Sequence, residues 1–247
     1  MSLWRTRRHW DHLAKTDPLW GVLTDPAKQG NRWPVEEFFA TGRKDVGVAL
    51  AFIFQYAPDL PRKTVLDFGC GVGRLTQALA GHFSEAVGVD FSAGMVDLAR
   101  QHNKHGERVR YVFNPRPDLS AFASGSVNLV YSVITLQHIP SAHAKQYMAE
   151  FVRVLSADGV AFFQVPDHLV IPPSRRLSLY PPTVAKKLRR WLNRYFLWTP
   201  VIDMYFMGRA EVAAVIDAAG GKIIAVQSTH QDAGPECVSH RYLVRKK

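Results

Sequence analysis

Two carboxylates and three glycines between residues 67 and 90 form the pattern with the clearest chemistry in this chain. Asp67 ends an apolar stretch, and Gly69, Gly71 and Gly73 follow it at alternate positions. Glycine has no Cβ, so such a turn can take a positive φ and let a ligand approach the backbone. Asp90 ends the next apolar stretch, seventeen residues after Gly73, where a carboxylate can accept hydrogen bonds from both hydroxyls of a ribose. The spacing therefore predicts a nucleoside-binding site.

The spacing also separates two classes of nucleoside cofactor. A dinucleotide fingerprint, G-x-G-x-x-G/A, needs a small residue at its third position. That position is Arg74 when counted from Gly69 and Thr76 when counted from Gly71. The pattern D-x-G-x-G-x-G instead resembles motif I of the class I S-adenosylmethionine-dependent methyltransferases. The resemblance implies S-adenosyl-L-methionine as the cofactor and S-adenosyl-L-homocysteine as the product.

The resemblance also implies where each part of the cofactor lies. Asp67, Gly69 and Gly71 are expected at the methionine end, with Gly73 completing the turn as a binding or a packing glycine. Asp90 is expected at the ribose. The remaining residues of the expected site follow the second, third and fourth strands: Phe91, Met95, Asn114, Ser132 and Val133.

Several of these assignments have structural alternatives. Met95 is either the apolar residue against the adenine or a core residue of the following helix. Asn114 is placed to accept from the adenine amino group, as Asp118 also is, but both stand beside prolines and are typical of turn residues.

His138 is the candidate general base. An imidazole titrates near neutral pH and can take the proton of an acceptor hydroxyl. The alternative is a structural histidine at the start of the next helix. Because a sulfonium already activates the methyl group, many such enzymes need mainly in-line placement and exclusion of water.

Length and composition indicate one α/β domain. The chain has 247 residues, and 31 Lys and Arg against 21 Asp and Glu give a net charge of +10, which favours anionic partners. Two cysteines, Cys70 and Cys237, form neither a disulfide framework nor a metal cluster, so no metal is expected and the cytoplasm is the predicted location. No apolar stretch approaches the twenty residues of a membrane span.

Apolar periodicity predicts alternating strands and helices, and hence a Rossmann-like, doubly wound, mostly parallel seven-stranded sheet. The last two strands resemble the antiparallel hairpin that ends the methyltransferase fold. The predicted strands are 64–68, 86–90, 109–113, 127–132, 160–165, 222–229 and 237–245. The predicted helices are 42–56, 74–82, 93–104, 141–155 and 209–219.

Two segments lie outside this core pattern. Residues 1–42 hold four of the six tryptophans, and they are predicted to form a helical, aromatic lid over a methyltransferase domain of residues 43–247. Residues 167–207 form an insertion with a basic amphipathic helix at 183–198, which either caps the domain or contacts lipid or a polyanion. The expected acceptor pocket draws on both segments and on the loop before His138: Trp20, Trp33, Phe39, Gln137 and Tyr205.

These features predict a methyltransferase that acts on an oxygen, with a nitrogen as the alternative, of a small-molecule, sugar or lipid-linked acceptor, with peripheral membrane contact as a further possibility. Two alternatives are an RNA methyltransferase and an inactive nucleic-acid- or membrane-binding protein on the same fold. The retained D-x-G-x-G-x-G and Asp90 argue against loss of the cofactor site. The sequence S-V-I-T after the fourth strand lacks the N/D-P-P-[FYW] motif of amino-methylating enzymes, which disfavours nucleic acid. Nothing in the sequence indicates an oligomeric state.

Overall fold

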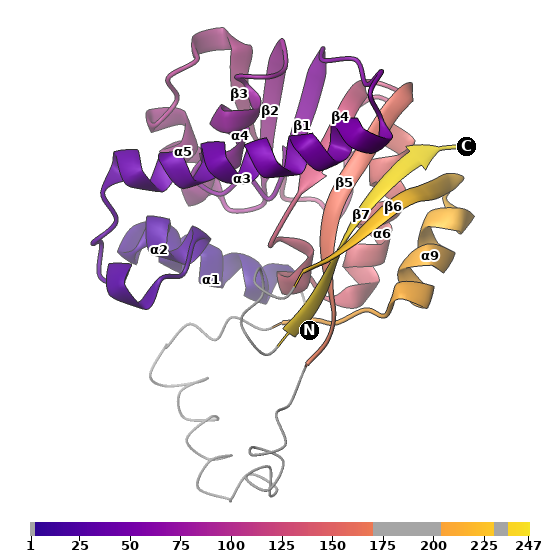
Figure 1. Ribbon diagram of the computed structural model, residues 1–247. Coiled ribbons are helices and arrows are strands. Elements are labelled where there is room, and N and C mark those ends of the chain that lie inside the picture. Colours follow the sequence, from indigo (N-terminus) through magenta and orange to yellow (C-terminus); the bar gives the residue numbers. More distant parts are fainter. Residues whose placement is uncertain (1–2, 170–203, 230–236) are drawn as a thin grey trace, which may run out of the picture.

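One seven-stranded sheet organises the protein (Figure 1). The computed structural model describes residues 3–169, 204–229 and 237–247. The strand order is β3-β2-β1-β4-β5-β7-β6, in which β1 to β5 pair in parallel and β7 runs antiparallel to β5 and β6. The predicted fold class is confirmed. The strands are β1 (Thr64–Phe68), β2 (Glu85–Asp90), β3 (Val109–Phe113), β4 (Val127–Ser132), β5 (Leu155–Leu169), β6 (Gly221–Thr229) and β7 (Cys237–Lys246).

Helices cover both faces of the sheet because the strands are apolar on both sides. Val65 packs with α3, α4 and α5 on one face, and its neighbour Leu66 packs with α6 and α9 on the other. The helices are α1 (Leu3–Thr16), α2 (Pro18–Val22), α3 (Val35–Tyr56), α4 (Arg74–Leu79), α5 (Ala93–Gln101), α6 (Ser141–Val154) and α9 (Arg209–Ala218), with short 3₁₀ turns η1 (Pro26–Lys28), η2 (Gly106–Arg108) and η3 (Leu136–His138).

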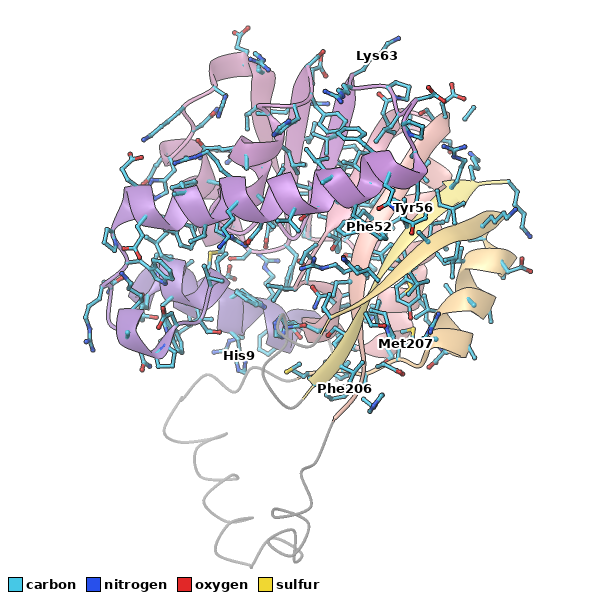
Figure 2. All side chains as sticks on the ribbon, in the orientation of Figure 1. His9, Phe52, Tyr56, Lys63, Phe206 and Met207 are labelled. Carbon is cyan, nitrogen blue, oxygen red and sulfur yellow. The ribbon has the colours of Figure 1, made fainter. Side chains whose placement is uncertain are left out.

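The helix α3 begins seven residues earlier than its apolar pattern predicts. The sequence suggests a start at Gly42, whereas the helix runs without a break from Val35 to Tyr56. A Cβ on Gly42 would lie 2.5 Å from the carbonyl oxygen of Arg74, so this glycine permits close packing of α3 on α4 and does not begin a helix. The predicted lid boundary at residues 42 and 43 therefore falls inside α3. Near the other end of α3, Phe52 and Tyr56 lie side by side (Figure 2), with ring centroids 5.1 Å apart.

The strand β5 is longer than predicted at both ends. It was expected at 160–165 but runs to Leu169, because it continues to pair with β7 as far as Cys237. It therefore includes Asp167, the first residue of the predicted insertion. The predicted basic helix at 183–198 lies outside the described residues.

The N-terminal helices α1 and α2 lie beneath the carboxyl ends of the central strands (Figure 1). Their apolar side chains join a separate cluster that includes Leu13, Trp33, Phe38 and Met95. Among the described residues, no helix is long and apolar enough to cross a membrane.

Candidate functional site

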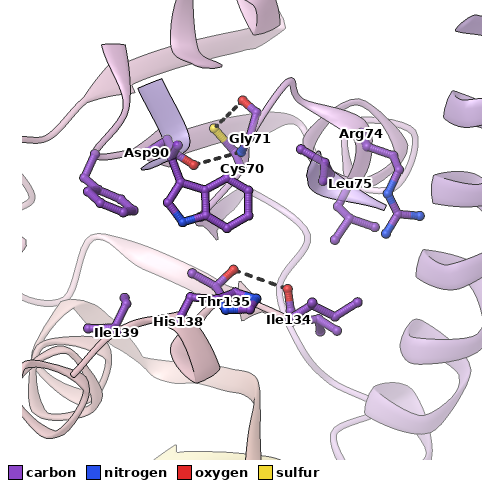
Figure 3. Close-up of a pocket in the computed structure, with 14 residues that line it drawn as sticks. Cys70, Gly71, Arg74, Leu75, Asp90, Ile134, Thr135, His138 and Ile139 are labelled. Carbon is purple, nitrogen blue, oxygen red and sulfur yellow. Dashed lines mark hydrogen bonds between the residues drawn. The ribbon is translucent and has the colours of Figure 1, made fainter. Parts of the chain in front are cut away.

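A narrow cavity lies beyond the carboxyl ends of β1, β2 and β4, where the strand order reverses. In open α/β sheets this switch point is where ligands bind. Figure 3 shows Cys70, Gly71 and Asp90 on one side of the cavity and Ile134, Thr135 and His138 on the other. The cavity volume is about 50 Å³, well below the ~300 to 1,000 Å³ of typical ligand pockets.

The glycine turn that forms one wall is left-handed at each glycine. Gly69 and Gly71 have φ values of 79° and 53°, a region that costs other residues about 1 to 2 kcal/mol. A Cβ on Gly69 would lie 2.2 Å from Thr135, and one on Gly71 would lie 2.7 Å from Val22. The side chains of Thr135 and Val22 therefore pack directly against the turn. Gly73 is the packing glycine, because a Cβ there would strike the Tyr111 hydroxyl at 2.3 Å.

Asp90 ties the glycine turn to the end of β2. Its Oδ2 accepts from the Gly71 amide at 2.9 Å and its Oδ1 accepts from the Ser92 amide at 2.8 Å. Each carboxylate oxygen has a second lone pair, so the group can still accept two hydroxyls from the cavity. Burial raises the pKa of Asp90 to about 6, against the lowering effect of the Ser92 and Gly71 amides.

Asp67 lies beneath the turn and does not line the cavity. Its Oδ2 accepts from the Thr76 hydroxyl at 2.6 Å, and the residue is 2 % exposed. Burial raises the pKa of this carboxyl to about 7, and the Thr76 hydrogen bond opposes the rise. The acid therefore holds α4 to β1 in this structure.

A smaller cavity of about 10 Å³ continues the site toward β3. Both cavities are lined by Gly69, Asp90, Phe91 and Thr135, and only the smaller one by Asn114. The Asn114 Nδ2 donates to the Asp118 carbonyl at 2.6 Å, so this side chain also closes the turn after β3.

His138 lines the larger cavity, opposite the glycine turn. Its Nε2 lies 3.1 Å from the side-chain amide of Gln137, which holds the ring in place. The Trp10 ring packs edge-on against the imidazole at 5.6 Å. Nearby Ile134 has a φ of 61°, which is an outlier for a β-branched residue. Such strain is concentrated at functional sites.

The remaining predicted residues lie around the two cavities and do not line them, with Val133 as the exception. Met95 is fully buried beside α1 and α3, and Ser132 donates to the Phe68 carbonyl at 3.0 Å. The indole nitrogens of Trp20 and Trp33 donate to backbone carbonyls of the N-terminal segment, and Phe39 packs in the same cluster. The Tyr205 amide donates to the Gln137 carbonyl, which brings this end of the insertion to the loop before His138.

Sequence reasoning missed the residues by which the N-terminal helices reach the site. Trp10 and Val22 line the larger cavity, and Asp11 accepts from the Ser92 hydroxyl at 2.7 Å, next to Asp90. The aromatic density of residues 1–42 signalled a lid but not which tryptophan faces the ligand. Helical spacing from Trp10 to Leu13 and Ala14 was the available signal.

Known proteins resemble this chain in both sequence and fold. Residues 65–159 match the protein-family model described as a methyltransferase domain. The biotin biosynthesis bifunctional protein BioHC of Cellvibrio japonicus is 29% identical over 188 residues, which are 73% of this chain and 32% of that protein. The ubiquinone biosynthesis O-methyltransferase of Thiobacillus denitrificans is 32% identical over 105 residues, 42% of this chain and 44% of that enzyme. The chain thus spans less than half the length of these curated relatives.

Solved structures show the same fold at low identity. Magnesium protoporphyrin IX methyltransferase from Synechocystis PCC 6803, with bound S-adenosylhomocysteine, superposes with a TM-score of 0.63 at 17% identity and 98% coverage of both chains. A SAM-dependent methyltransferase of Leishmania major reaches 0.66 at 13% identity, covering 97% of this chain and 81% of that one. Residues 65–159 therefore belong to the methyltransferase domain family, and the chain has the class I S-adenosylmethionine-dependent methyltransferase fold.

Proposed function

We propose that this protein is an enzyme that transfers a methyl group from S-adenosylmethionine to an oxygen of a small-molecule acceptor and releases S-adenosylhomocysteine. The observation that carries the proposal is the Asp90 carboxylate, buried at the switch point with lone pairs left for two hydroxyls. The match of residues 65–159 to the methyltransferase domain supports it.

The residues at the two cavities fit the parts of this cofactor. Asp90 would bind the ribose, and Phe91 and Asn114 would face the adenine from the smaller cavity. Gly69 and Gly71 would lie along the methionine chain, with Val133 beneath it. Met95, Ser132 and Asp67 would support these contacts from behind. When bound, S-adenosylmethionine supplies a methyl group activated by its sulfonium.

The chain's own contribution at the reacting end is placement and exclusion of water. Trp10 and Val22 cover the cavity from α1 and α2, and Ile139 adds apolar surface. His138, which lines the cavity, would take the acceptor's proton. Gln137 is 5 % exposed and contacts the His138 ring, so it would position this histidine at the acceptor.

The acceptor class rests on the relatives and on charge. Ubiquinone biosynthesis O-methyltransferases are among the matched proteins, which supports oxygen as the methylated atom. The net charge of +10 favours an anionic, sugar-phosphate or lipid-linked acceptor. Trp20, Trp33 and Tyr205 would border this acceptor through the lid and the insertion, whereas Phe39 lines a separate cavity between α3 and α4.

The proposal is tested by calorimetry with S-adenosylhomocysteine on the wild type and on Asp90→Ala. We expect the substitution to weaken binding by about 1.5 to 3 kcal/mol, the range for charged hydrogen bonds. Asp97→Ala is the matched control, because Asp97 is an exposed acid of the neighbouring helix α5 and should leave binding unchanged.

A folded wild type that shows no heat with S-adenosylhomocysteine would overturn the cofactor assignment. An unchanged dissociation constant in a folded Asp90→Ala variant would remove this residue from the site.

A further inference from the structure

The helix α1 has two faces of different chemistry. Its inward face carries Leu13, which is buried, and Trp10, which lines the switch-point cavity. Its outward face carries Trp4, Arg8 and Lys15, which stand at positions i, i+4 and i+11 and are all exposed. Residues at this spacing lie on one side of an α-helix, because eleven residues make about three turns. An indole and two cations therefore point away from the protein together.

The outward face of α1 is positively charged. The helix contains four Lys and Arg residues and one acid, Asp11. The Asp11 carboxylate accepts from the Ser92 hydroxyl at 2.7 Å and pairs with Arg7 at 3.6 Å. These two contacts turn the carboxylate toward the start of α5 and away from the outward face. The charges of Arg8 and Lys15 are therefore not balanced by an acid of their own helix.

Trp4 is the most exposed large apolar side chain among the described residues, at 61 %. The Arg8 guanidinium lies 4.7 Å from the centre of its ring, which is a cation–π contact. The two side chains therefore present an apolar ring and a positive charge side by side. Tryptophan is enriched where a membrane meets water, because its ring is apolar and its N–H is polar. Arg and Lys residues near a membrane are attracted to anionic lipid headgroups.

We infer that the outward face of α1 docks on an anionic lipid bilayer. Charge complementarity favours this partner, and the exposed indole distinguishes it from a partner that offers charge alone. The apolar face of α1 packs on the protein, so docking uses surface charge and one indole without insertion of the helix. The helix lies along the carboxyl edge of the strands (Figure 1), and its Trp10 lines the switch-point cavity. Docking through this face would bring that cavity close to the lipid headgroups, whatever reaction the cavity supports.

Co-sedimentation of the full chain with phosphatidylcholine vesicles, with and without phosphatidylserine, tests this inference. Wild-type protein should bind the vesicles that contain phosphatidylserine, and binding should weaken as salt is added. The double variant Arg8→Gln and Lys15→Gln should weaken binding by roughly tenfold or more, because each cation near an anionic surface contributes about fivefold. The control variant Lys63→Gln and Lys222→Gln removes the same charge from exposed residues outside α1 and should bind as the wild type does.

Fluorescence quenching by brominated phosphatidylcholine in the same vesicles tests the role of Trp4. The lipid should quench the tryptophan emission of the wild type. Trp4→Phe keeps an apolar ring, so vesicle binding should persist while the quenching decreases.

The inference is overturned if the wild type does not prefer vesicles that contain phosphatidylserine, or if the control variant loses as much binding as the α1 variant does. Unchanged quenching in Trp4→Phe would also overturn it. A wild type that binds single-stranded RNA through Arg8 and Lys15 but does not bind vesicles would assign this face to nucleic acid instead. Because the readout is vesicle binding, the result is independent of the proposed methyl transfer.

Discussion

At the residue scale, the two buried acids of the site, Asp67 and Asp90, have different roles. Asp90 faces the cavity and holds the glycine turn through two backbone amides. Asp67 bonds Thr76 beneath the turn and does not reach the cavity. Asp67 therefore stabilises the glycine turn from below. Asp90, at the end of β2, is the carboxylate that a ligand can contact.

The elevated pKa of Asp67 leads to a prediction about stability. Its pKa rises from 3.8 in the unfolded chain to about 7 because burial disfavours the charge. Between these values the folded state binds more protons than the unfolded state, so the free energy of unfolding falls as pH rises from about 4 to 7. Asp67→Asn keeps an acceptor for Thr76 and removes the charge, and should raise that free energy at pH 8 by on the order of 2 to 4 kcal/mol.

Urea unfolding of the ligand-free protein at pH 5 and pH 8 measures this difference. In Asp67→Asn the free energy of unfolding should lose most of its dependence on pH. The control Asp97→Asn changes an exposed residue and should keep that dependence. An equal change in the free energy of unfolding between pH 5 and pH 8 in the wild type and in Asp67→Asn would show that Asp67 is ionised in the folded protein.

At the element scale, the helix α2 packs against the glycine turn through the side chain of Val22. A Cβ on Gly71 would strike Val22 of α2 at 2.7 Å, in a backbone conformation that already disfavours side chains. Gly71→Ala should therefore destabilise the fold by about 1 to 2 kcal/mol through the backbone alone, with a further loss from the clash. Combining Gly71→Ala with Val22→Ala should restore only the part of the stability that the clash removes.

A double-mutant cycle on the thermal midpoint measures this coupling. Additive effects of the two substitutions would mean that α2 does not rest on the turn.

The helix α1 should control how long a ligand stays in the cavity. Trp10 lines the cavity and packs on His138, and the cavity is too small for a nucleoside cofactor while α1 and α2 lie in place. Trp10→Ala should speed S-adenosylhomocysteine dissociation, since an aromatic contact contributes about 1 kcal/mol. Stopped-flow fluorescence would measure the rate, with Trp4→Ala as the control because Trp4 is 61 % exposed. Equal rates in the two variants would argue against a lid.

At the scale of the whole molecule, the charge of +10 is the feature that the switch-point cavity leaves unexplained. Lys186, Lys187, Arg189 and Arg190 form a dense cationic run in the sequence, outside the described residues. Changing all four to Gln should leave S-adenosylhomocysteine affinity intact, because the proposed site is built from other residues. With an anionic or lipid-linked acceptor, the change should raise the KM and flatten its salt dependence.

Retention on anionic liposomes and kinetics across a salt series test this prediction. The control changes Lys44, Lys63, Arg110 and Lys222 to Gln, which removes the same charge from exposed positions; Lys63 lies at the opposite end of the sheet from the switch point (Figure 2). Identical behaviour of both variants would assign the effect to net charge alone.

The sequence by itself determined the sheet and the carboxylate at its switch point. Short apolar runs and glycine-rich turns are local signals, so the bounds of β1, β3 and β4 match the prediction to the residue. Asp90 was identified in the same way, from its distance along the chain to a glycine turn.

Only the tertiary structure decided which side chains from distant segments meet at that switch point. Trp10 and Val22 reach the cavity because α1 and α2 fold back beneath the strands, and the start of α3 before Gly42 follows from close packing against Arg74. The cavity between α3 and α4 likewise joins residues 36, 74 and 104. Such contacts depend on shape and distance across the fold, and the local sequence pattern does not specify them.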